Sequence, residues 1–206
     1  MNLEPLEIIN CEQGSPEWFE ARRGCVTMSE VDSVLAKGRG KTPSKARQSY
    51  MLTLAGEILS GEIEEPATSR SLERGRIMEA EARDYYAFLK DCEPRKVGFL
   101  KRGQVGCSPD SLIGDEGLHE IKTKAPKYHL QVVLDDVLPE EHKPQCMGAL
   151  WIADREWIDF QSYWPKLPPF IKRVYRDEPY IAELAAAVAQ FLDELNELTE
   201  KLRRYT

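Results

Sequence analysis

The sequence has few cysteines and histidines, no long apolar run and no excess of positive charge. Its five cysteines are scattered, and no two form a Cys-x-x-Cys pair, so neither a disulfide framework nor a zinc or iron–sulfur site is expected. No stretch approaches the roughly 20 apolar residues of a membrane span, and residues 1–5 lack the basic and apolar regions of a signal peptide. These absences predict a soluble protein with free thiols in a reducing cytoplasm.

A length of 206 residues suits one domain with a sizeable core, and we expect a single domain over residues 1–206. The net charge of −7 counts against nucleic acid as a ligand, because phosphates favour basic surfaces. The charge is unevenly distributed, however. No acidic residue occurs from Lys37 to Tyr50, and a second basic cluster lies at 95–102. Such patches either hold DNA in a confined groove of an acidic protein or are solvated loops.

The order of the expected elements indicates an α/β fold. Ser15 before Pro16 predicts the start of a helix, and apolar residues at helical spacing predict further helices. Residues 97–100, 105–107 and 157–164 carry strand signals. The expected helices span residues 16–22, 30–36, 44–60, 70–90, 144–151 and 179–204, with loops at 38–44 and 61–69. This order predicts a small mixed sheet flanked by helices.

The most informative stretch lies between Asp110 and Lys122. Gly114–Gly117 is a turn signal between apolar residues and predicts a β-hairpin. Side chains alternate along a strand, so Glu120 and Lys122 share one face while Ile121 points to the other. The hairpin then brings Asp110 beside Glu120, which places two carboxylates and one ammonium group in a single patch.

This patch has the groups that metal-assisted phosphodiester hydrolysis requires. Carboxylate oxygens are hard donors suited to Mg²⁺ or Mn²⁺, which also accept phosphate oxygens. A lysine on the same face can lower the pKa of an attacking water or offset charge in the transition state. The alternative is a surface hairpin with an incidental salt bridge, because Glu-x-Lys arises often by chance.

Six segments in a fixed order resemble the lambda exonuclease family of phage recombinases, within the PD-(D/E)xK nuclease superfamily. The resemblance runs from about residue 14 to the C-terminal helix. Its segments are Trp18–Gly24, Thr27–Val31, Gly75–Glu79, Ser108–Asp110, Glu120–Lys122, and Gln145 six residues before Trp151. It implies a PD-(D/E)xK restriction-endonuclease-like core.

The resemblance implies roles for the residues of the hairpin. Asp110 and Glu120 would be metal ligands, and the backbone carbonyl of Ile121 would complete that site. Lys122 would orient or deprotonate the water nucleophile. The implied cofactor is Mg²⁺, with Mn²⁺ as a substitute, and two ions are expected.

Residues outside the hairpin also match positions of the family. Glu79 matches a helical acid near a second metal, and Gln145 matches a glutamine that supports the catalytic lysine and water. Arg22, Ser29 and Ser108 match residues that hold a terminal 5′-phosphate. A guanidinium binds phosphate bidentately, and hydroxyl groups at a helix start add donors. The choice of Arg22 rather than Arg23 as the phosphate ligand rests only on the register of the motif.

The implied activity is a Mg²⁺-dependent, 5′-to-3′ exonuclease of double-stranded DNA that releases 5′-mononucleotides and leaves 3′ overhangs for recombination. The family further implies a ring-shaped homotrimer, a single-strand-annealing recombinase as partner, and a phage or prophage origin in a bacterial host. A strand-separating wedge is expected near 40–52, with Tyr50 or Met51 as candidates, whereas His129 and His142 match no family position. An endonuclease or resolvase on the same core, or a non-catalytic DNA-binding protein, remains an alternative.

Overall fold

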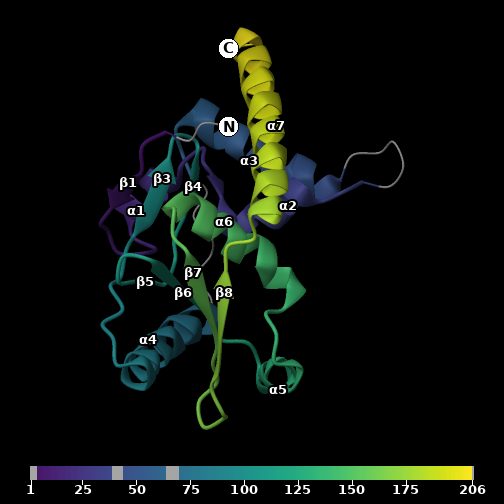
Figure 1. The fold of residues 1–206 in the computed structure, drawn as a ribbon. Coiled ribbons are helices and arrows are strands. Elements are labelled where there is room, and N and C mark those ends of the chain that lie inside the picture. Colours follow the sequence, from purple (N-terminus) through teal and green to yellow (C-terminus); the bar gives the residue numbers. More distant parts are fainter. Residues whose placement is uncertain (1–3, 39–43, 64–69, 206) are drawn as a thin grey trace.

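The computed structural model describes residues 4–38, 44–63 and 70–205 (Figure 1). The loops expected at 38–44 and 61–69 therefore lie largely outside the described residues. Two four-stranded sheets and seven α-helices make up the described part of the chain. The α/β class with a small mixed sheet flanked by helices is confirmed, and the structure adds a second sheet.

The first sheet has the strand order β1-β3-β4-β2. Strands β1 and β3 are antiparallel, as are β3 and β4, whereas β2 runs parallel to β4. Its strands are β1 (Glu7–Ile9), β2 (Val26–Thr27), β3 (Phe99–Arg102) and β4 (Val105–Cys107). The two short outer strands β1 and β2 were not predicted from the sequence.

The second sheet has the order β5-β6-β7-β8 and carries the predicted hairpin. Its strands are β5 (Ser111–Ile113), β6 (Gly117–Lys122), β7 (Trp157–Ser162) and β8 (Phe170–Tyr175). Strands β5 and β6 are antiparallel, with Ser111 opposite His119, which confirms the hairpin. Gly114 adopts a positive φ of 52° in the turn, a conformation that glycine reaches without a steric cost. Strands β6 and β7 run parallel, so the sheet is mixed.

The helices cover both faces of the second sheet (Figure 1). Their bounds are α1 (Pro16–Arg22), α2 (Val31–Leu35), α3 (Lys45–Ser60), α4 (Arg70–Lys90), α5 (Pro126–Asp135), α6 (Lys143–Ala153) and α7 (Glu178–Leu202). Short 3-10 helices are η1 (Met28–Glu30), η2 (Glu140–His142) and η3 (Arg203–Tyr205). Helix α4 lies against one face of the sheet, where Ala82 packs with Ile121 and Tyr163. Helix α6 is almost entirely buried and contacts the first sheet as well as β7.

Local sequence accounts for the helix ends that were predicted. The side chain of Ser15 accepts a hydrogen bond from the Trp18 amide and caps α1, with Pro16 at the first position. Gly61 ends α3 in the left-handed conformation, with φ +74°. Along α7, an apolar stripe that includes Leu184, Val188 and Phe191 is buried in the core. Among the described residues, no helix combines the length and apolar character required to cross a membrane.

Candidate active site

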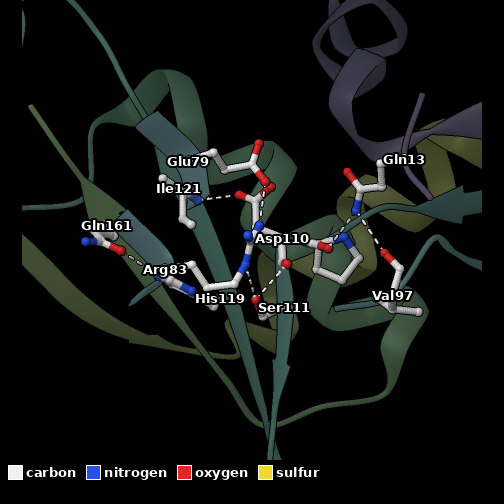
Figure 2. A network of polar contacts seen from close by, with 10 residues as sticks. Gln13, Glu79, Arg83, Val97, Asp110, Ser111, His119, Ile121 and Gln161 are labelled. Carbon is white, nitrogen blue, oxygen red and sulfur yellow. Dashed lines mark hydrogen bonds and ion pairs between the residues drawn. The ribbon is translucent and has the colours of Figure 1, made fainter. Parts of the chain in front are cut away.

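The hairpin brings Asp110 against the backbone between Glu120 and Ile121. Asp110 lies just before β5, and its amide donates to the His119 carbonyl oxygen at 3.0 Å. Its Oδ2 accepts a hydrogen bond from the Ile121 amide at 2.5 Å (Figure 2). The carboxylate is thus fixed at the edge of β6, next to the residues that were predicted to share its site.

Glu120 and Lys122 project from the same face of β6, as the alternation of the strand predicts. Lys122 Nζ lies 2.7 Å from Glu120 Oε1. Gln145, from the first turns of α6, donates from Nε2 to Glu120 Oε1 at 2.6 Å and accepts from Lys122 Nζ on Oε1 at 3.1 Å. The three side chains therefore form a closed ring of hydrogen bonds, while the Ile121 side chain packs on the opposite face.

The carboxylates of this region affect each other's pKa and that of Lys122. Burial raises the pKa of Asp110 well above its usual range, and the nearby carboxylates of Glu120 and Glu79 raise it further. For Lys122, burial acts to lower the pKa, but Glu120 and then Asp110 outweigh it, and the net pKa is raised. The ammonium group is therefore held in its charged form.

The donor set fits a hard divalent cation. Carboxylate oxygens suit Mg²⁺ and Mn²⁺. Burial and then repulsion by Glu120 and Glu79 raise the pKa of Asp110, and a bound cation would offset both effects. In the described part of the chain, no three His, Cys, Asp or Glu side chains are close enough together to hold an ion. Glu120 is engaged by Lys122 and Gln145, so a bound ion would exchange with one of these donors.

Glu79 approaches the same region from helix α4. Figure 2 shows its carboxylate beside Asp110, and both side chains line one groove. Its Oε1 accepts from Arg83 Nη2 at 2.5 Å, and Arg83 Nε donates to Ser111 Oγ at 3.0 Å. Arg83 was not predicted from the sequence, although its spacing of four residues from Glu79 is a helical ion-pair signal.

Two neighbouring cavities contain the predicted site residues. A groove of about 1640 Å³ is lined by Glu79, Asp110 and Ile121 among others. A smaller cavity of about 180 Å³ is lined by the remaining predicted residues apart from Lys122, namely Arg22, Ser29, Ser108, Glu120 and Gln145. Arg22 lines both cavities. The structure therefore gathers all nine predicted residues at one place, since Lys122 contacts Glu120 and Gln145.

The structure distinguishes Arg22 from Arg23. The Arg22 guanidinium lies over the Trp18 ring, 4.0 Å from its centroid, and burial lowers its pKa from the usual value. It makes no ion pair among the residues that the structure describes. Arg23 instead points away, pairing with Glu20 and donating to the Gly61 carbonyl oxygen. Only Arg22 faces the cavities.

Two supporting residues were missed by sequence reasoning. Trp18 Nε1 donates to Ser108 Oγ at 2.9 Å, so the indole orients both Ser108 and Arg22. The spacing of four residues between Trp18 and Arg22 was an available signal. Gln13 Nε2 donates to the Pro109 carbonyl oxygen at 3.1 Å, which ties the N-terminal segment to the turn before Asp110. A lone glutamine in a loop gave no signal.

The two unassigned histidines have structural surroundings. His129 is fully buried, with Nδ1 2.8 Å from Ser162 Oγ and Nε2 2.9 Å from the Pro168 carbonyl oxygen. His142 stacks on Phe160 with centroids 5.2 Å apart, and burial, with Lys122 and Lys124, lowers its pKa to about 4. Neither histidine lines the groove or the smaller cavity.

The wedge candidates lie on helix α3. Tyr50 lines the groove, stacks on Phe191 with centroids 5.7 Å apart and accepts a hydrogen bond from the Thr27 amide at 3.0 Å. Met51 packs against the core. A wedge role for either residue stays a prediction.

The chain is similar in sequence and structure to known proteins. The model of the YqaJ-like viral recombinase domain matches residues 17–156. The crystal structure of an alkaline exonuclease from Laribacter hongkongensis is similar, with 34% identity, a TM-score of 0.82 and coverage of 93% of this chain and 97% of that one. The same enzyme in complex with dAMP gives 33% identity, a TM-score of 0.84 and the same coverage. No curated protein matches the chain in sequence.

A more distant structure shares the fold. A phage-related exonuclease from Haemophilus somnus 129PT matches with a TM-score of 0.65 at 12% identity, over 86% of this chain and 96% of that one. Together with the structure from L. hongkongensis, it confirms the expected PD-(D/E)xK-like α/β core.

Proposed function

The chain belongs to the YqaJ-like viral recombinase family, and on that premise we propose that it is a Mg²⁺-dependent exonuclease of double-stranded DNA. It digests from 5′ to 3′, releases 5′-mononucleotides and leaves 3′ overhangs for homologous recombination. The similarity to an alkaline exonuclease supports a DNA exonuclease, and the dAMP bound by that relative supports a mononucleotide product.

One observation supports recognition of a DNA end. Arg22, Ser29 and Ser108 line the same small cavity as Glu120 and Gln145. A terminal phosphate bound by the first three residues would therefore lie beside the groups that are proposed to act on the phosphodiester. An endonuclease would not require a phosphate site in this position.

The hairpin supplies the proposed metal ligands. Asp110, Glu120 and the backbone carbonyl of Ile121 would hold Mg²⁺, for which Mn²⁺ substitutes, and Glu79 would contribute to a second ion. A bound divalent ion lowers the pKa of a water ligand and neutralises charge on the phosphate and the leaving oxygen. The fit of the site to this role rests on the oxygen donors and on the excess negative charge around Asp110.

Lys122 and Gln145 would position the attacking water. Gln145 holds the Lys122 ammonium by a hydrogen bond of 3.1 Å, which fixes the direction of its remaining donors. Burial acts to lower the pKa of Lys122, but Glu120 and Asp110 raise it overall, so without an ion the side chain is an ammonium group. With an ion on these carboxylates, Lys122 would orient or deprotonate the attacking water. Lys122 also offsets negative charge that develops on the phosphate.

Recognition of the DNA end is assigned to three side chains. The Arg22 guanidinium would bind the terminal 5′-phosphate bidentately, and Trp18 restricts its orientation from one side. Ser108 and Ser29 would donate from their hydroxyl groups. Ser108 Oγ already accepts from Trp18 Nε1, so its own hydrogen is free to point to the phosphate.

The proposal extends to assembly and partner. A ring-shaped homotrimer that encloses DNA would reconcile a net charge of −7 with continued binding during digestion. A single-strand-annealing recombinase would take up the 3′ overhang. The family description as a viral recombinase supports a phage or prophage origin, with the reaction in the cytoplasm of a bacterial host.

Strand polarity and product can be tested on one substrate. A linear duplex carrying a label at either the 5′ or the 3′ end of one strand is digested with Mg²⁺. The proposal predicts early release of the 5′ label as a mononucleotide, while the 3′ label remains on long strands until late in the reaction. Early release of the 3′ label, or of labelled oligonucleotides, would contradict it.

A further inference from the structure

A buried arginine connects helix α4 to the strand that follows Asp110. Arg83 is 7% exposed, and it is the only lysine or arginine among the described residues that is buried to this degree. Burying a guanidinium is costly unless its donors are satisfied. Two of the Arg83 nitrogens donate to different elements: Nη2 donates to Glu79 Oε1 on its own helix, and Nε donates to Ser111 Oγ on β5.

Ser111 continues this connection to the proposed metal ligand. Its Oγ donates to the Asp110 carbonyl oxygen at 2.6 Å, and its side chain is fully buried. A continuous path of hydrogen bonds therefore runs from the Glu79 carboxylate through Arg83 and Ser111 to the backbone of Asp110 (Figure 2). Glu79 lies at one end of the path and the Asp110 backbone carbonyl at the other, and both residues line the same groove.

The path does more than neutralise Glu79. A helical pair of Glu79 and Arg83 at i,i+4 would form without any contact to the sheet, and an aliphatic side chain could fill the space between α4 and β5. The bond from Arg83 Nε to Ser111 instead couples the direction of the Glu79 side chain to the position of Asp110. Glu79 and Asp110 lie 31 positions apart in the sequence, and the bond from Arg83 to Ser111 joins the helix of one to the strand that follows the other.

We propose that Arg83 is a positioning residue which, through Ser111, holds Glu79 and Asp110 in register so that both can serve a second divalent cation. This inference rests on the proposed function, because it assumes that both carboxylates bind metal. Arg83 would act through Glu79 and Ser111 and would not itself be a ligand of the ion. Its guanidinium is suited to the task because its planar, separated donors reach two acceptors at once, whereas a lysine presents one compact ammonium group.

Two variants separate this role from a general contribution to stability. R83K keeps the positive charge but removes the guanidinium group that donates to Glu79 and Ser111 at the same time. S111A leaves the pair of Arg83 and Glu79 intact and removes the hydroxyl group that connects Arg83 to the Asp110 carbonyl oxygen. The matched control is R173K, because Arg173 also holds a buried carboxylate, that of Asp159, with two bonds of 2.9 Å, yet Asp159 does not line the groove.

The measurement is Mn²⁺ binding, followed by the electron paramagnetic resonance signal of free Mn²⁺, together with thermal unfolding. We expect wild type to bind two ions, and R83K and S111A each to weaken one of them roughly 10- to 100-fold, the range typical of residues that support metal ligands. R173K should lower the melting temperature without altering Mn²⁺ binding. If R83K does not fold, S111A decides the result.

The inference is overturned if the folded variants bind Mn²⁺ as wild type does, or if wild type binds a single ion. A different result would contradict the proposed function. Wild type that binds two Mn²⁺ ions but digests no DNA would contradict the exonuclease assignment, and the role of Arg83 in metal binding would still be decided by the variants.

Discussion

The Lys122 ammonium lies 2.7 Å from Glu120 Oε1. The two side chains are two positions apart in the six-residue strand β6 and project from the same face. Gln145, from helix α6, bridges the two. An exposed pair of this kind contributes little to stability, but this pair is largely buried, with Glu120 4% exposed. Its geometry is thus set by the surrounding structure rather than by the two charges alone.

Removing the bridge should therefore affect catalysis more than DNA binding. We expect Gln145→Ala to lower kcat roughly 10- to 100-fold, as is usual for groups that orient catalytic residues, with little change in KM for DNA. Steady-state kinetics on a linear duplex measures both. The matched control is Gln161→Ala, a buried glutamine on the opposite face of the sheet that bonds to His119 and to the Ala82 carbonyl oxygen. It should lower the melting temperature and spare kcat; a larger loss of kcat in the control would refute the assignment.

The charge on Asp110 should destabilise the metal-free protein. Burial, Glu120 and Glu79 raise its folded pKa above the ordinary value of 3.8, so between these two pKa values the folded state binds more protons than the unfolded chain. Stability then falls as the pH rises through that window. Asp110→Asn keeps an oxygen acceptor for the Ile121 amide and removes the charge.

Thermal unfolding in EDTA from pH 4 to pH 9 checks this expectation. The Asp110→Asn variant should melt higher than wild type at pH 8, by about 2–4 °C for each 1 kcal/mol gained, and the difference should shrink towards pH 4. Adding Mg²⁺ should stabilise wild type and not the variant. A variant that melts at or below the wild-type temperature at pH 8 would contradict the electrostatic account of the site.

Arg22 should determine the preference for a 5′-phosphate. Substrates with a 5′-phosphate should be digested faster than those with a 5′-hydroxyl, and Arg22→Gln should abolish the difference. Loss of a hydrogen bond to a charged group costs about 1.5–3 kcal/mol, which corresponds to roughly 10- to 100-fold in kcat/KM. Arg23→Gln is the matched control, since Arg23 points to Glu20 and Gly61. Equal rates on both substrates with wild type would argue for an endonuclease.

The sequence was sufficient to predict the centre of the site because local rules determine it. Alternation along a strand places Glu120 and Lys122 on one face, and the turn at Gly114 brings Asp110 to Ile121. The helices with clear caps, such as α1 after Ser15, were also predicted from local signals.

The remaining features depend on tertiary packing that no local pattern encodes. The contact of Gln145 with Lys122 was expected only from the family resemblance, because it joins α6 to β6. The contact of Arg83 with Ser111 joins α4 to β5 and was missed. Strands β1 and β2 have three and two residues, too few to show a period, and α5 was missed although Pro126 at its first position was an available start signal.

The proposed homotrimer can be tested by measuring the molar mass of the protein in solution. Light scattering of the purified protein should give about three times the chain mass of 23.6 kDa, with no dissociation on moderate dilution. A monomer at all concentrations would refute the ring. Such a result would leave the active site untouched, because every residue assigned to it comes from one chain.

The central claim is that the hairpin of Asp110 and Glu120 cuts DNA only from an end. Linear and covalently closed circular forms of the same duplex, incubated with the protein in Mg²⁺ and in EDTA, test it most directly. Asp110→Ala serves as the inactive variant, and Glu116→Ala, in the exposed turn of the same hairpin, as its control. The account predicts that wild type and Glu116→Ala digest the linear duplex only with Mg²⁺, that Asp110→Ala does not, and that the circle stays intact. Nicking of the circle, or digestion by folded Asp110→Ala, would contradict it.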